Sequence, residues 1–208
     1  YPVVALVGYT NAGKSTLFNR LTKAGVMAED MLFATLDPTL RAVHLPYGSD
    51  IILSDTVGFI SDLPTMLIEA FKATLEEVVE ADIVLHVRDI SHVDSEAQRA
   101  DVEAVLAGLG IVESPTKPII EVWNKLDLLD AEQNHSVVNA AQRRPVQERP
   151  ILISALTGKG IDDLLTGVEA SLARERVIVD LRVDAADGQG RSWLYEHTEV
   201  LGRSEAED

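Results

Sequence analysis

An eight-residue glycine-rich segment constrains the fold of this chain more than any other feature: Gly8-Tyr9-Thr10-Asn11-Ala12-Gly13-Lys14-Ser15. It matches the spacing G-x-x-x-x-G-K-[ST], follows an apolar run at residues 3–7 and precedes an amphipathic segment at residues 14–22. A strand, a glycine-rich turn and a helix in this order form a loop whose backbone N–H groups and helix N-terminus face a phosphate group. This context favours a phosphate-binding loop over a chance glycine-rich turn.

The chemistry of the loop predicts a bound nucleoside triphosphate and Mg²⁺. The ammonium group of Lys14 is expected to reach the β- and γ-phosphates, and the hydroxyl group of Ser15 is expected to ligate Mg²⁺. The loop alone does not select the base. The predicted phosphate-side contacts are Asn11, Ala12, Gly13, Lys14, Ser15 and Thr16.

Apolar runs alternate with amphipathic segments along the chain, which predicts a three-layer α/β fold with a mostly parallel six-stranded sheet and helices on both faces. The expected strands are residues 3–7, 41–45, 51–55, 83–88, 119–124 and 151–154. The expected helices are residues 14–22, 65–79, 94–109, 130–142 and 161–173. Residues 23–40 show no clean period and are interpreted as a long loop, a kind of segment that is often functional.

A change of composition near residue 176 predicts two parts, a nucleotide-binding domain at residues 1–175 and the start of a small C-terminal module at residues 176–208. In the second part we expect a strand at 177–183, a turn at 187–190, a helix at 191–200 and a disordered end at 204–208. The chain begins with Tyr1 rather than Met, so we expect a fragment of a longer protein.

The base is predicted by Asn124-Lys125-Leu126-Asp127, which ends the apolar run at 119–124. The Asp127 carboxylate can accept two hydrogen bonds from N1 and the exocyclic amine of guanine, and adenine lacks this pair of donors. Asn124 is expected to bind the base edge or brace the loop, and the Lys125 stem is expected to cover the ring. Alone this pattern could be a polar turn, but after a phosphate loop it favours guanine.

Ser154-Ala155-Leu156 ends the next apolar run and is expected to supply the last guanine contact, a backbone N–H to the base oxygen. A Ser-Ala pair after a strand is common, and only its order in the chain gives it weight.

Asp55-Thr56-Val57-Gly58 follows the run at 51–55 and is expected to serve the γ-phosphate side. Asp55 can hold Mg²⁺ through water, and the Gly58 N–H can contact the γ-phosphate. In the long loop, Thr35 is the preferred hydroxyl ligand of Mg²⁺ and Thr39 the reserve. The predicted catalytic residues are Lys14, Thr35 and Gly58, and the predicted metal residues are Ser15, Thr35 and Asp55.

Net charge and composition argue against two classes of protein, those that bind bare nucleic acid and those that span a membrane by a helix. Eighteen basic against 34 acidic residues give a net charge of −16, so no direct binding of bare nucleic acid is expected. No apolar run reaches the roughly 18 to 20 residues of a membrane helix. The absence of cysteine is compatible with a reducing cytoplasm, where we expect the protein to act.

Four segments together resemble the HflX family of translation-factor-class GTPases, over residues 2–173. They are residues 8–19, Phe33-Ala34-Thr35-Leu36-Asp37-Pro38-Thr39, residues 55–60, and Leu63-Pro64 with residues 67–77. The resemblance implies a GTPase that hydrolyses GTP to GDP, associates with the large ribosomal subunit and splits or rescues stalled ribosomes. It also implies a missing basic N-terminal domain.

Two positions qualify the expected activity. Phe59 follows the Asp55–Gly58 motif, where Ras-like proteins have a water-orienting Gln, so slow intrinsic turnover is expected. Asn11 stands where some related GTPases bind K⁺, which makes K⁺ a second candidate cofactor. The alternatives are a nucleotide-gated binding module with negligible hydrolysis and an adenine-nucleotide phosphotransferase, which the motif at 124–127 disfavours.

Overall fold

The computed structural model describes residues 1–23, 39–56, 58, 72–111, 117–174, 181–184, 187–198 and 202–203. The chain divides into two compact units, Tyr1–Glu175 and Arg176–Asp208. The first unit contains a six-stranded sheet, and the described part of the second contains one helix.

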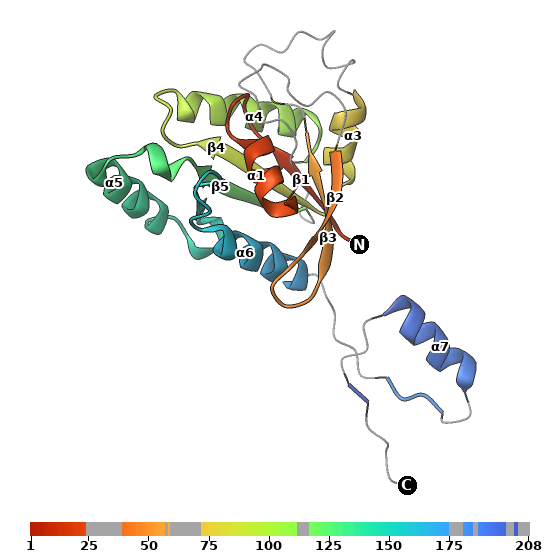
Figure 1. Ribbon diagram of the computed structural model, residues 1–208. Helices are drawn as coiled ribbons and strands as arrows, with labels where there is room; N and C mark the ends of the chain where they lie inside the picture. Colours follow the sequence, from red (N-terminus) through yellow and green to blue (C-terminus); the bar gives the residue numbers. More distant parts are fainter. Residues whose placement is uncertain are drawn as a thin grey trace. The chain divides into compact units, whose positions relative to one another are not determined.

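The sheet has the strand order β2-β3-β1-β4-β5-β6, and β2 alone among these strands runs antiparallel to its neighbour (Figure 1). The strands are β1 (Val3–Val7), β2 (Thr39–His44), β3 (Asp50–Asp55), β4 (Ile83–Asp89), β5 (Ile119–Asn124) and β6 (Ile151–Leu152). The α-helices described in this unit are α1 (Lys14–Thr22), α3 (Lys72–Glu80), α4 (Ser95–Gly108), α5 (Ala131–Gln142) and α6 (Ile161–Arg174). The predicted fold class is confirmed.

The central strands of the sheet are buried on both faces, which explains why β1 and β4 are largely apolar, whereas the edge strand β2 is mostly exposed. Along β1, Val4 and Leu6 belong to a cluster with α1 and α6, whereas Ala5 and Val7 belong to a cluster with α3 and α4. All seven residues of β4 are buried. Successive side chains of a strand point to opposite faces, so a strand covered on both faces needs apolar residues at every position.

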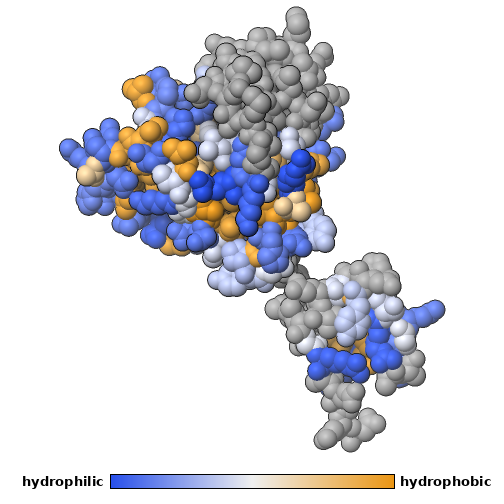
Figure 2. All heavy atoms as spheres, in the orientation of Figure 1, coloured by the Kyte–Doolittle hydropathy of each residue, from blue (hydrophilic) through white to orange (hydrophobic). Residues whose placement is uncertain are grey.

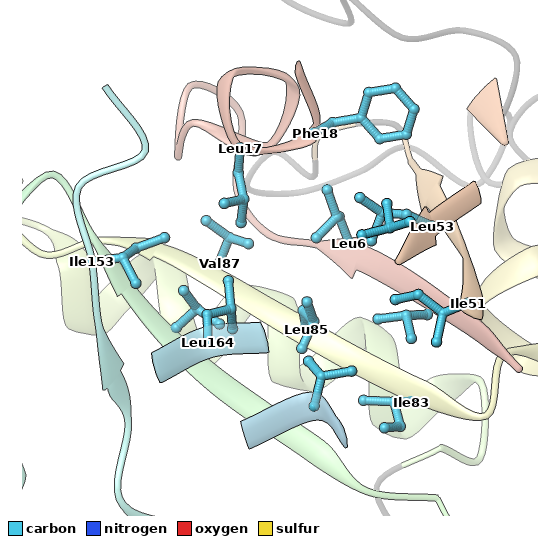
Figure 3. Close-up of a cluster of buried hydrophobic side chains, with 14 of the residues drawn as sticks. Leu6, Leu17, Phe18, Ile51, Leu53, Ile83, Leu85, Val87, Ile153 and Leu164 are labelled. Atoms are coloured by element: carbon cyan, nitrogen blue, oxygen red, sulfur yellow. The ribbon is translucent and has the colours of Figure 1, made fainter. Parts of the chain in front are cut away.

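The cluster on the α1 and α6 face fixes the helix that follows the glycine-rich loop. Figure 3 shows Leu17 pointing from α1 toward Val87, with Leu6 and Leu53 beneath Phe18. Leu17 and Phe18 are at most 1% exposed, and burial of each such side chain contributes about 1.5–3 kcal/mol. The start of α1 is therefore held against the sheet by its own apolar face.

Several boundaries differ from the predicted ones. β2 begins at Thr39 rather than at 41, because Thr39 and Leu40 pair with Asp55 and Ser54 of β3. β6 ends at Leu152 rather than at 154, since its pairing with β5 covers two residues. The helix predicted at 65–79 is described only from 72 onward, as α3.

The second unit corrects three predictions. Residues 181–184 form no strand, and the rest of the strand predicted at 177–183 lies outside the described residues. The turn predicted at 187–190 is instead the start of helix α7 (Gly188–His197), which also ends before residue 200. The Asp187 carboxylate accepts a hydrogen bond from the Gly190 N–H (2.8 Å), and this cap offsets the helix-breaking tendency of the two glycines. The end predicted to be disordered, 204–208, lies outside the described residues.

Over α5 the visible surface is mostly hydrophilic (Figure 2). In the described part of the chain, none of the helices combines the length and the apolar character needed to cross a lipid bilayer.

Candidate nucleotide-binding site

The predicted site residues gather at one edge of the sheet. The parallel strands β1, β3, β4 and β5 all end at this edge, where they are followed or terminated by Gly8, Asp55, Asp89 and Asn124. Ser154 lies two residues beyond β6, at the same edge. Ligands of open parallel sheets bind at the carboxyl ends of the strands, so topology alone brings together motifs that are far apart in the sequence.

The glycine-rich loop forms a tight turn that leads into α1. Asn11 adopts a left-handed conformation (φ 60°), and the Ala12 N–H donates to the Tyr9 carbonyl (3.2 Å). The first bond of the helix runs from the Leu17 N–H to the Gly13 carbonyl (2.9 Å). The N–H groups of residues 13–16, which include that of Thr16, are therefore the free donors of the helix N-terminus, where an anion is stabilised.

Lys14 is a buried cation at the centre of this turn. Its side chain reaches back over the loop, and Nζ donates to the carbonyl oxygens of Gly8 (3.1 Å) and Tyr9 (3.0 Å). Burial lowers the pKa of Lys14 to about 8, and the nearby Asp55 carboxylate only partly opposes this shift. The ammonium group is thus less well compensated than in water, and a phosphate group would supply the missing negative charge.

Ser15 and Asp55 provide oxygen atoms suited to a hard cation. The Ser15 hydroxyl donates to Asp55 Oδ2 (2.9 Å), and Asp55 is 2% exposed. Mg²⁺ is held in nucleotide sites by one or two protein oxygens together with phosphates and water, and this pair fits that requirement. Thr39, the reserve ligand, lies opposite Asp55 in the ladder between β2 and β3. Thr35, the preferred ligand, lies outside the described residues.

Gly58 lies close to the phosphate loop. A Cβ atom at this position would lie 2.9 Å from Thr10 Cγ2 and 3.2 Å from Lys14 Nζ, so only glycine allows this approach of the two backbones. The Gly58 backbone is consequently near the ammonium group predicted to bind the γ-phosphate. Phe59 lies outside the described residues.

Asn124 joins the phosphate loop to the loop after β6. Its Nδ2 donates to the Ala12 carbonyl (2.9 Å), and its Oδ1 accepts from the Ala155 N–H (2.9 Å). Asn124 is 2% exposed, so both ends of its amide are satisfied inside the protein. Of the two roles open to this residue in the sequence, the contacts match the bracing role.

Asp127 lies beside the same loop. The Ser154 hydroxyl donates to Asp127 Oδ1 and accepts from the Thr157 N–H (3.1 Å). Ser154 is fully buried, whereas Leu156 is 66% exposed at the mouth of the site. The sequence segments at 124–127 and 154–156 therefore form one hydrogen-bonded unit.

Asp89 is a site residue that the sequence reasoning missed. Its Oδ2 forms an ion pair with Lys125 Nζ (2.8 Å), and its Oδ1 accepts from the N–H (3.0 Å) and hydroxyl (2.5 Å) of Ser91. Lys125 adopts a left-handed backbone conformation (φ 69°), and the ion pair with Asp89 holds its side chain in one direction. An acidic residue at the end of a buried strand next to β5 was the available signal.

Taken together, a phosphate loop, a hydrogen-bonded Ser–Asp pair and an Asn–Lys–x–Asp loop meet at the carboxyl edge of a mostly parallel sheet. This combination of fold and site defines the P-loop GTPase class.

Comparison with protein families narrows this class. The family described as 50S ribosome-binding GTPase matches residues 3–125, and the HflX C-terminal domain matches residues 136–208. The second match includes part of α5, all of β6 and α6, and the second compact unit. The chain belongs to the HflX family of GTPases.

Individual relatives agree with this assignment. The chain is 45% identical over 205 residues to GTPase HflX of Magnetococcus marinus, covering 99% of this chain and 45% of that protein. It is 42% identical over 195 residues to GTPase HflX of Escherichia coli, covering 94% and 44%. Putative GTP-binding protein 6 of Homo sapiens is 40% identical over 203 residues, covering 96% and 37%. The chain spans less than half the length of these curated relatives.

Solved structures share the fold. Era in complex with MgGDPNP and nucleotides of 16S ribosomal RNA is 25% identical with a TM-score of 0.65, covering 89% of this chain and 60% of that one. A GTP-binding protein from Sulfolobus solfataricus in complex with GDP is 27% identical with a TM-score of 0.61, covering 84% and 53%.

Proposed function

We propose that this chain binds GTP and GDP together with Mg²⁺, hydrolyses GTP to GDP and phosphate, and serves as the nucleotide-driven part of a ribosome-associated switch. The observation that carries the proposal is the bridge made by Asn124. One buried amide bonds both the phosphate loop, at Ala12, and the loop after β6, at Ala155. A single ligand with a phosphate chain and a base suits a site whose two ends are joined in this way.

In this proposal each group has a defined task at the phosphate side. Lys14 and the N–H groups of residues 13–16 bind the β- and γ-phosphates, and the Gly58 N–H contacts the γ-phosphate. Ser15, Asp55 and Thr35 hold Mg²⁺, which when bound neutralises charge on the phosphate oxygens. Water attacks the γ-phosphate in line, and Lys14 stabilises the negative charge that develops on the leaving oxygens.

At the base side, Asp127 accepts hydrogen bonds from N1 and the exocyclic amine of guanine. The loop containing Ser154, Ala155 and Leu156 donates a backbone N–H to the base oxygen. Lys125, directed by Asp89, covers the ring.

The ribosomal role rests on family membership. The family name refers to binding of the 50S subunit, and we propose that this chain receives its signal from the large subunit in the cytoplasm and acts in ribosome splitting or rescue. Direct binding of bare RNA by this chain is not proposed, because its net charge is −16.

The test is GTP turnover by the 208-residue chain with and without purified large ribosomal subunits, with Lys14→Ala as the blank. We expect slow basal turnover and at least about tenfold stimulation by subunits, a gain within the range that stabilisation of the transition state by a partner supplies. Basal turnover without stimulation would reject a ribosomal signal received by this chain. No turnover above the blank in either condition would reject the enzyme.

A second candidate function is a nucleotide-gated binding module with negligible hydrolysis, and Phe59 favours it because a phenyl ring cannot orient water. Phe59→Gln separates the two candidates. A large rise in basal turnover, of about a hundredfold, would show that the missing polar group limits hydrolysis. Unchanged turnover would show that the absence of a polar side chain at position 59 does not limit hydrolysis.

Asn11 also carries the proposal of a K⁺ requirement. Turnover that is faster in potassium than in sodium buffer is expected, and equal turnover in the two buffers would reject it.

A further inference from the structure

The side chain of Arg20 links the helix of the phosphate loop to the loop after β6. Arg20 lies on α1, six residues beyond Lys14. Its Nε–H donates to the Ala155 carbonyl (2.5 Å), and its Nη2–H donates to the Leu156 carbonyl. One guanidinium group therefore bonds two consecutive carbonyl groups that are 135 and 136 residues away in the sequence.

The loop is shaped around this guanidinium. Gly158 has a φ of +91°, and a Cβ at this position would lie 3.1 Å from Arg20 Nη1. The Gly158 N–H donates to the Ser154 carbonyl (2.8 Å), which closes the turn over the arginine. A side chain at position 158 would crowd the arginine, so glycine at this position permits the contact.

Arg20 holds the peptide group whose N–H is available to a ligand. The Ala155 N–H already donates to Asn124 Oδ1 (2.9 Å). The next N–H, that of Leu156, has no hydrogen-bond partner among the described residues. This N–H belongs to the same planar peptide group as the Ala155 carbonyl, and in a trans peptide the two point in opposite directions. Fixing the carbonyl toward Arg20 therefore fixes the Leu156 N–H away from it.

The bond also changes the strength of the donor. A hydrogen bond from a charged guanidinium to a carbonyl polarises the peptide group and makes its N–H a better donor. We propose that Arg20 is a positioning residue of the guanine site, which orients and polarises the Leu156 N–H toward the base oxygen O6. The inference rests on the proposed guanine-nucleotide function and deepens it, since it names the group that sets selectivity for O6.

The proposal predicts that Arg20 affects the contact to O6 of the base but not the contacts to N1 and the exocyclic amine. The Asp127 contacts to N1 and the exocyclic amine are supported by Ser154, whose backbone N–H donates to Lys159 O (2.9 Å) without help from Arg20. Removal of Arg20 should therefore weaken the contact to O6 and leave the contact to the amine intact. A purely structural role would weaken both equally.

The experiment compares three nucleotides on the wild-type chain, Arg20→Ala and Arg20→Lys. The probes are GDP, 6-thio-GDP, in which sulfur replaces only O6, and IDP, which lacks only the exocyclic amine. We expect Arg20→Ala to lower GDP affinity about tenfold, as the loss of a charge-assisted hydrogen bond would, and to bring the GDP to 6-thio-GDP affinity ratio close to one. The GDP to IDP ratio should stay at the wild-type value. Arg20→Lys should be intermediate, because an ammonium cannot make the two-pronged contact.

Arg149→Ala is the matched control. Arg149 is also an exposed arginine that donates to two main-chain carbonyls, those of Arg144 and Gln142 (both 3.2 Å), which lie at the end of α5. It should leave all three affinities unchanged. Equal weakening of GDP and 6-thio-GDP by Arg20→Ala, or the same effect from Arg149→Ala, would overturn the inference while leaving guanine-nucleotide binding intact. Failure of the wild-type chain to bind GDP would overturn the proposed function itself.

Discussion

The two ends of the site differ in how far the protein satisfies its own polar groups. At the base end, Asn124, Ser154 and Asp127 are joined by hydrogen bonds within the chain. At the phosphate end, the buried ammonium of Lys14 has two carbonyl partners and a pKa lowered to about 8. The base end is therefore preorganised by hydrogen bonds and an ion pair within the chain, whereas the phosphate end carries a desolvated positive charge.

Because the two ends of the site differ in this way, we expect them to contribute differently to nucleotide binding. A preorganised loop loses little entropy on binding and can discriminate between bases, because only guanine offers the pair of donors that the Asp127 carboxylate would accept. A desolvated cation attracts an anion strongly in a region of low dielectric constant, but it does not distinguish one phosphate chain from another. We expect affinity to depend mainly on the phosphate end and selectivity on the base end.

Removal of the phosphate-end charge should have the largest effect. Lys14→Ala is expected to weaken GTP binding about a thousandfold, since a buried charge contact is lost. Lys14→Met, which keeps most of the stem, should leave the free energy of unfolding of the nucleotide-free chain at or above the wild-type value, because the ammonium is destabilised by burial. Calorimetry and chemical unfolding measure these two quantities. Lys23→Gln, at the other end of α1, is the control, and unchanged GTP affinity of Lys14→Ala would refute the loop assignment.

A change at the base end should alter selectivity instead. Asp127→Asn replaces a carboxylate that accepts two hydrogen bonds by an amide that also donates, which suits the second carbonyl of xanthine. GDP affinity should fall about a hundredfold while affinity for XDP rises. Competition between the two nucleotides measures the change. Retained preference for GDP would count against the base assignment.

Sequence reasoning found the residues whose signal is local. Lys14, Ser15, Asp55 and Asn124 stand at strand ends or helix starts, where hydrophobic periodicity predicts the element and strand direction predicts the edge. It missed Arg20 because the partners of that side chain are 135 residues away and nothing in the helix sequence marks the contact.

Contacts between distant segments also set the boundaries of several strands, and the local sequence does not show them. Pairing with a neighbour sets the length of β2 and β6, so their ends cannot be read from the strand sequences alone. The start of α7 was missed because two glycines predict a turn more strongly than one aspartate cap predicts a helix.

The affinity of the chain for nucleotide should depend on pH through the buried ammonium group of Lys14. In the proposed site, phosphate binding requires protonated Lys14, so nucleotide affinity should be nearly constant below the pKa of about 8 and fall as the pH rises through it. Between pH 7 and 9 the protonated fraction, and with it GDP affinity, should drop about tenfold. Lys14→Arg keeps its charge over this range and serves as the control. A flat wild-type profile would contradict the lowered pKa.

The stability of the nucleotide-free chain should respond in the opposite direction. The pKa of Lys14 is lowered in the folded state from 10.5 to about 8, so between these values the unfolded chain binds more protons. This single group then makes the chain more stable as the pH rises from 8 to 10.5.

The smallest effect is expected at the ion pair between Asp89 and Lys125. The pair is partly exposed, with side-chain exposures of 11% and 28%, so its contribution is modest. Asp89→Asn should speed GDP release about threefold, and Glu103→Gln, which breaks the exposed pair with Arg99, should not. Stopped-flow measurement of a fluorescent GDP analogue tests this. Equal release rates in all three proteins would show that Asp89 does not position Lys125.

The most direct test of the account is the affinity of the 208-residue chain for GDP and for ADP, measured side by side in the presence of Mg²⁺. In the proposed site, both nucleotides offer the same diphosphate to Lys14, and only guanine matches Asp127 and the loop after β6. We predict that GDP binds at least about a hundredfold more tightly than ADP, because adenine lacks the N1–H and exocyclic amine pair that the Asp127 carboxylate would accept. Equal affinity for the two nucleotides would contradict it.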